Sequence, residues 1–145
     1  MESVSCVLMA SGASPPDIGG QPFRAVIVIE DEVTDEWRDL VSKWLVGSGC
    51  LYMMAWGQGC TKWDDSVDHA NLAEFDWGDI PDDKFVMTTW HESEALEETF
   101  WFAKFSAFHP TVSLPRLVIV HVANEGRCDE LVKLYEQQVP VEDDE

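Results

Sequence analysis

The stretch "FRAVIVIE" (Phe23–Glu30) is a short apolar run, rich in β-branched side chains and without regular polar positions. Such a strand is typically buried on both faces, as in a parallel sheet that helices cover on its two sides. The next run, "TDEWRDLVSKWLVGSG" (Thr34–Gly49), has its apolar residues at helical spacing instead. The change of period predicts the first strand–helix unit of an α/β fold.

The ends of this first helix carry their own signals. Thr34 is a suitable N-cap, and Asp35 and Glu36 follow it in the first turn, where negative charge is favoured. Gly47 and Gly49 can end the helix. The predicted apolar face contains Trp37, Leu40, Val41, Trp44 and Leu45.

The alternation of strand and helix recurs three more times along the chain. Further strands are predicted at Cys50–Trp56, Lys84–Trp90 and Arg116–Ala123, and further helices at Asp64–Phe75, Ser93–Phe108 and Arg127–Gln138. No hairpin turn joins consecutive strands, which favours right-handed crossovers. We therefore predict a three-layer α/β fold, flavodoxin-like or Rossmann-like. Its mainly parallel four-stranded sheet has helices on both faces and the order 2-1-3-4.

The domain organisation follows from length and composition. The chain has 145 residues, which is the usual size of one domain. Residues 1–22 are rich in Ser, Gly and Pro and are predicted as an irregular lead-in, in which Cys6–Met9 could add an edge strand. Residues 23–138 form the single α/β domain, and residues 139–145 form an acidic tail.

The net charge is strongly negative. Twenty-eight Asp and Glu stand against nine Lys and Arg, a formal charge of −19, and the terminal "EDDE" (Glu142–Glu145) accounts for only four of these charges. Such a field repels nucleic acid and anionic membranes and favours a basic protein partner. Solubility alone is the competing interpretation.

The four cysteines, Cys6, Cys50, Cys60 and Cys128, are scattered without the paired spacing of a zinc site. Free thiols in a reducing compartment are the expectation for a domain with an adequate core. The first residues lack a basic region followed by an apolar run, and no stretch has transmembrane length. A cytoplasmic protein without membrane attachment is predicted.

The candidate site lies where the strands end, because ligands of open α/β sheets bind beyond the carboxyl ends of the strands. The residues predicted to bind there are Trp56, Cys60, Trp63, Asp64, Asp65, Trp90, His91 and Glu92. Five of them, Trp56, Asp64, Asp65, Trp90 and His91, are expected to meet at one rim. Each has a structural alternative: first-turn acids at the start of a helix, or a histidine that orients a loop.

Complete catalytic motifs are absent from the sequence. It contains no GxxxxGK[ST] loop, no GxGxxG after the first strand and no GxSxG elbow. The acids and lysines of a response-regulator receiver are not in the required places either. We therefore expect no cofactor, although clustered carboxylates at the rim would suit a divalent cation.

Four segments resemble a known family. "CLYMMAWGQGC", "WDDSVDHANL", "FVMTTWHESE" and "AFHPTV" look like those of a family of small bacterial proteins of unknown function. The similarity covers roughly Phe23 to Tyr135. It implies a bacterial, single-domain protein and carries no activity.

Two functions from different classes remain. The favoured one is a small acidic protein-binding domain, such as an immunity-type or defence-linked inhibitor or adaptor, that recognises a basic partner. The alternative is an enzyme acting on a nucleotide or related small molecule, with a divalent cation, whose groups would be Glu30, Asp31, Asp64, Asp65, His91 and Glu92. A homodimer is also predicted, because Trp101, Phe102 and Phe105 cannot all face one sheet.

Overall fold

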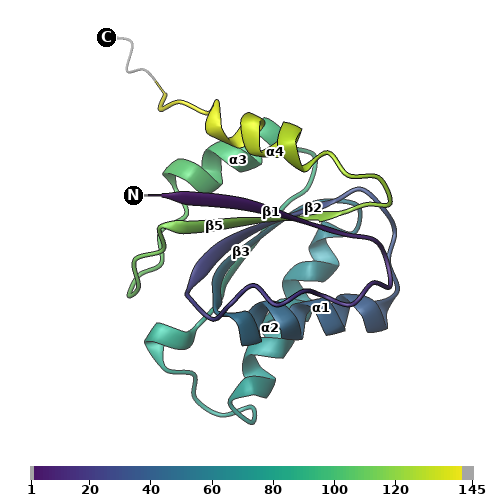
Figure 1. The fold of residues 1–145 in the computed structure, drawn as a ribbon. Helices are drawn as coiled ribbons and strands as arrows, with labels where there is room; N and C mark the ends of the chain where they lie inside the picture. Colours follow the sequence, from purple (N-terminus) through teal and green to yellow (C-terminus); the bar gives the residue numbers. More distant parts are fainter. Residues whose placement is uncertain (1, 142–145) are drawn as a thin grey trace.

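The computed structural model describes residues 2–141 and contains one parallel five-stranded sheet between two pairs of helices (Figure 1). The strands are β1 (Ser3–Met9), β2 (Phe23–Ile29), β3 (Cys50–Gly57), β4 (Met87–His91) and β5 (Arg116–Val122). The helices are α1 (Asp35–Ser48), α2 (Cys60–Glu74), α3 (Leu96–Phe105) and α4 (Cys128–Glu136), with a short 3-10 helix at Asp82–Lys84. The three-layer α/β class predicted from the sequence is confirmed.

The strand order is β1-β5-β2-β3-β4, and every neighbouring pair is parallel. The predicted order was wrong, because β3 lies between β2 and β4 instead of at an edge. Helices α1 and α2 carry the chain outward along one face, and α3 returns it across the other face to β5 (Figure 1). The order therefore reverses between β2 and β5.

The sheet has five strands where four were predicted. The additional strand, β1, lies in the segment expected to be an irregular lead-in and pairs with β5 from Ser3 to Met9. It extends the edge strand suggested at Cys6–Met9 by three residues. A second edge of the sheet, formed by β4, lies at the opposite side.

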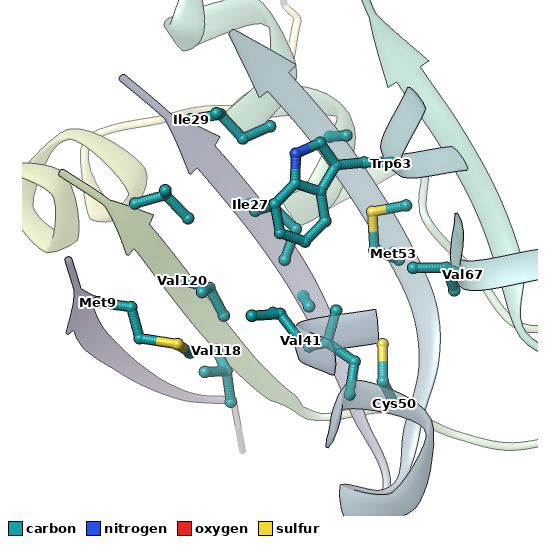
Figure 2. Packing of buried hydrophobic residues seen from close by; sticks show 14 of the residues in the cluster. Met9, Ile27, Ile29, Val41, Cys50, Met53, Trp63, Val67, Val118 and Val120 are labelled. Carbon is teal, nitrogen blue, oxygen red and sulfur yellow. The ribbon is translucent and has the colours of Figure 1, made fainter. Parts of the chain in front are cut away.

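The core consists of two apolar layers, one on each face of the sheet. All seven residues of β2 are buried, as its largely apolar sequence predicts, and its one charged residue, Arg24, forms a salt bridge with Glu2 at 2.6 Å. Ile27 and Ile29 face α1 and α2, where Figure 2 shows them beside Trp63 of α2. Val26 and Val28 face α3 and α4. Alternate residues of the other strands divide between the same two layers.

The helix ends agree with the sequence signals only in part. Thr34 is the N-cap of α1, accepting a hydrogen bond from the Trp37 backbone N–H at 3.2 Å, and Gly49 ends the helix in the left-handed conformation. Helix α2 begins at Cys60, four residues before the predicted start. Ser93 does not cap α3, because Ala95 occupies that position.

The chain turns sharply from β3 into α2 at Gly57. Its φ of 107° is unfavourable for other residues, and an added Cβ would collide with the carbonyl of Ile29. The neighbouring Gln58 N–H donates to that same carbonyl at 2.9 Å. Gly57 thus lets the end of β3 cross closely over the end of β2.

The cysteines correct the expectation of four free thiols. Cys6 of β1 and Cys128 at the start of α4 form a disulfide, whereas Cys50 and Cys60 are free and buried. The pairing follows from the position of β1, since α4 packs over this strand. No helix in the described part of the chain is long and apolar enough to cross a membrane.

Candidate functional site

Strand β4 is one of the two outer strands of the sheet, and its side chains alternate between the two faces. Met87, Thr89 and His91 share the α3 face with Trp56, because Trp56 pairs with His91. Thr88 and Trp90 point to the opposite face, which α2 covers. The sheet therefore separates the residues that were expected to form a single cluster.

On the α2 face, three carboxylates form a compact acidic cluster. Oxygens of Asp64, Asp65 and Asp68 lie within 4.8 Å of one another, and Asp68 accepts a hydrogen bond from the Thr88 hydroxyl at 3.0 Å. Within residues 2–141, no lysine or arginine forms a salt bridge with any of the three. This arrangement can attract a cation or a basic side chain.

The electrostatics of this cluster are unfavourable. Burial raises the pKa of Asp68, and the charges of Asp64 and Asp65 raise it further, against the lowering effects of the Thr88 hydrogen bond and His69. An approaching positive charge would relieve the repulsion. The sequence predicted Asp64 and Asp65 in the first turn of α2. They lie beyond the first turn, because the helix begins at Cys60.

On the α3 face, His91 belongs to a separate polar group. Its Nδ1 lies 3.1 Å from the Glu94 carboxylate, and its Nε2 lies 2.9 Å from the Thr89 hydroxyl. The indole of Trp56 donates to the Glu94 carbonyl at 2.8 Å. His91 is buried and tilted against Phe102. These contacts orient the loop between β4 and α3, which was the structural alternative considered for His91.

Two predicted binding residues lie in the interior. The side chain of Trp63 is fully buried among the core residues (Figure 2). It packs edge-on against Trp37, with the ring centroids 6.4 Å apart. Cys60 is also buried, and burial raises the pKa of its thiol, which opposes nucleophilic chemistry. The early start of α2 explains both corrections, because Cys60, Trp63 and Val67 follow helical spacing toward the core.

Large aromatic side chains remain accessible along this side of the molecule. Trp90 is 51% exposed, Phe85 45% and Trp77 61%. Trp77 has a positive φ of 64° and lies edge-on to His69 of α2. Glu92 is exposed just after β4. Trp90 and Glu92 were predicted from the sequence but Asp68 was not, although its spacing of four from Asp64 places both on one side of a helix.

A groove of about 400 Å³ lies beside the start of β4. Asp68 and Thr88 contribute to its wall, so the groove adjoins the acidic cluster. Its full lining is Asp68, Asn71, Leu72, Ile80, Phe85, Val86, Met87 and Thr88. An apolar side chain could occupy the groove while a neighbouring positive charge meets the carboxylates.

A second polar network lies at the carboxyl ends of β2 and β5, where the strand order reverses. The Glu30 carboxylate is bound by the buried imidazole of His121 and by two nitrogens of Arg127, each at 3.1 Å. Burial works to raise the pKa of Glu30, but the hydrogen bonds and charges of Arg127 and His121 together lower it. Glu30 in turn is the main cause of the raised pKa of Arg127.

This second network adjoins a crevice of about 750 Å³ between the starts of α3 and α4. Trp56, Arg127 and Lys133 are part of its lining. His121 and Arg127 were not predicted from the sequence, because their contacts with Glu30 depend on β5 being the neighbour of β2. All three Arg127 nitrogens already bind Glu30 or Glu130, so the network is paired within the chain.

The strand order and the covering helices define a three-layer α/β domain with an acidic outer edge. The chain belongs to the family described as "Domain of unknown function (DUF7684)", whose model matches residues 4–138. The resemblance to an uncharacterised family is thereby confirmed. No curated protein and no solved structure matches the chain.

Proposed function

We propose that this protein is a small acidic binding domain that recognises a basic protein partner through α2 and β4, as an immunity-type or defence-linked inhibitor or an adaptor would. The observation that carries the proposal is the cluster of Asp64, Asp65 and Asp68, which has no cationic partner among the described residues. Close carboxylates of this kind repel one another, and a basic partner supplies the missing positive charge.

The distribution of charge along the sequence supports a binding site on the side of the molecule formed by α2 and β4. The segment from Cys60 to His91, which contains α2 and β4, holds eight Asp and Glu against Lys62 and Lys84, a net charge of −6. Concentrated negative charge accelerates association with a basic partner and disfavours acidic ones.

Exposed aromatic side chains supply the second element of a protein interface. Trp90 and Phe85 belong to β4 and the segment just before it, and both are about half exposed. Tryptophan is enriched among the residues that dominate binding energy. In such interfaces the acids attract the basic partner, and the aromatic side chains contribute much of the binding energy.

The enzymatic alternative has weaker support. His91 and the acids of α2 lie on opposite faces of the sheet, so they do not converge on one reacting atom. The three carboxylates alone could hold a divalent cation, but carboxylate clusters are common on acidic surfaces without one. We therefore place protein binding first.

The homodimer, the bacterial origin and the cytoplasmic location stay predictions. Trp101 and Phe105 contact each other, and the Trp101 indole donates to the Val139 carbonyl, so the chain itself covers part of the proposed dimer surface. The disulfide Cys6–Cys128 weighs against a reducing compartment, where such bonds are rare.

The proposal is tested by titrating the protein with oligolysine at low salt and following tryptophan fluorescence. The triple variant Asp64→Asn/Asp65→Asn/Asp68→Asn should bind about tenfold more weakly than the unchanged protein. A matched control, Glu125→Gln/Asp129→Asn/Glu136→Gln, removes the same charge from the exposed surface around α4 and should retain the affinity within about threefold. Equal losses in both variants would mean that only net charge matters, and would refute the proposed site.

A further inference from the structure

We propose that β4 receives an extended segment of the basic partner as a sixth strand of the sheet, an inference that rests on the proposed function. Strand β4 pairs with β3 on one side only. In the described chain, Met87–His91 forms no backbone–backbone hydrogen bond outside that pairing. The outer row of amide and carbonyl groups is therefore available for pairing with another chain.

The sequence of β4 lacks the features that commonly protect edge strands. "MTTWH" (Met87–His91) contains no lysine, no carboxylate and no proline, and its register with β3 runs without a bulge. Natural sheets use such features to prevent strand addition. Their absence leaves the backbone of β4 open, and the acids that surround it select which chains can approach.

The opposite edge of the sheet provides an internal comparison. Strand β1 is also free of charged residues, but residues 3–29 carry only Asp17 and Arg24 and so have no net charge. Residues 127–136, whose helix α4 packs over β1, carry three acids against Arg127 and Lys133, so the β1 edge offers a basic segment less attraction than the acidic cluster beside β4 does. Charge complementarity therefore favours β4 over β1 as the edge strand that pairs with the basic segment.

The side-chain pattern of the occupant follows from the surroundings of β4. Successive side chains of a strand point to opposite faces, so residues two apart would lie on the α2 face, about 6.8 Å from each other. Lysine or arginine at one such position would meet the acidic cluster around Asp68. An apolar residue at a neighbouring position on the same face would enter the groove lined by Leu72, Ile80 and Phe85.

A second copy of this chain is a poor occupant. Each chain carries −19, and joining two β4 edges would bring two acidic clusters together. Like charges placed opposite each other across a strand pair are destabilising. The sequence of the chain's own C-terminus, which ends in "EDDE", has the wrong sign for the same reason. An extended basic segment of a different protein is the occupant that the charges favour.

The test uses a peptide of about nine residues, long enough to span β4, in which lysine and valine alternate at every second position with threonine between them, so that both side-chain types lie on one face. Two further peptides carry N-methyl groups on alternate amides, one set on each edge of the strand, which removes hydrogen bonds but keeps charge and sequence. We expect the unmethylated peptide to bind and to shift the amide resonances of Met87–His91. One methylated peptide should lose about tenfold in affinity, and the other should retain it.

The outcomes separate the two proposals. If all three peptides bind equally and all are lost in the Asp64→Asn/Asp65→Asn/Asp68→Asn variant, the acidic surface binds basic chains without strand addition, and only the present inference fails. If none binds at low salt while the protein remains folded, the proposed function fails as well. If binding shifts the amides of β1 instead of β4, the assignment of the edge is refuted.

Discussion

Glu30 and Asp68 are both partly buried carboxylates, but the charged groups nearest to them differ in sign. Glu30 is held between His121 and Arg127, and its pKa is lowered although burial opposes this. Asp68 has two carboxylates beside it and no salt bridge among the described residues, and its pKa is raised by burial and by those neighbours. Glu30 thus stabilises the fold, whereas Asp68 costs stability that a partner could restore.

The comparison separates the acids that serve structure from those available for function. In a chain with 28 acidic residues, net charge alone does not make this distinction. The salt bridges within the chain make this distinction, because a carboxylate that already binds an arginine is less available to bind a ligand. Within the described residues the acidic cluster of α2 forms no salt bridge, and it lies beside an open sheet edge.

The largest effect is expected from Glu30→Gln. The change removes the charge that holds Arg127 and faces the buried His121, and it should lower the free energy of unfolding by about 1–3 kcal/mol. The exposed Glu32→Gln is the control and should change it by less than about 0.5 kcal/mol. Urea unfolding measures both, and equal effects would show that the Glu30 network does not stabilise the fold.

The pH dependence of the Glu30 contribution has a definite sign. Because its folded pKa lies below the unfolded value near 4.5, the contribution is fully present above that value and is lost as pH falls through the folded pKa. The stability difference between the protein and Glu30→Gln should therefore be constant near neutral pH and shrink below about pH 4. A difference that grows on acidification would contradict the paired state of Glu30.

A smaller effect of opposite sign is expected from Asp68→Asn. The folded pKa of Asp68 lies above its usual 3.8, so its charge opposes folding at neutral pH. The substitution should raise the melting temperature by about 1–3 °C at pH 7. The gain should disappear in acid, where Asp68 is protonated in both states. Asp79→Asn, at an exposed acid, serves as the control, and a lower melting temperature for Asp68→Asn alone would overturn the comparison.

The sequence predicted the elements well and their arrangement less well. The apolar run of β2 and the caps of α1 depend on local pattern, and the structure agrees with both. The strand order depends on the direction that each crossover takes, which no local pattern encodes. The network of Glu30, His121 and Arg127 was therefore missed, since it exists only because β5 lies beside β2.

The candidate site was predicted in part for a related reason. Placing the start of α2 at Asp64 left Trp63 in a loop, although Cys60, Trp63 and Val67 already show helical spacing. Trp56 and His91 were expected at the same rim as the acids, and they do lie at neighbouring strand ends. The alternation of side chains along β3 and β4 places Trp56 and His91 on the α3 face, opposite the acids. Which face each side chain takes depends on the strand register, which the sequence did not define.

The most direct test is to measure the pKa of Asp68 from its side-chain carboxyl carbon resonance by NMR, with and without the alternating lysine–valine peptide. In the free protein the pKa should lie above 3.8, and saturation with the peptide should lower it, since a positive charge then faces the carboxylate. By linkage, the affinity for the peptide should decrease as the pH falls through that range. A free pKa at or below 3.8, or one that the bound peptide leaves unchanged, would contradict the claim that this acidic cluster is kept for a basic partner.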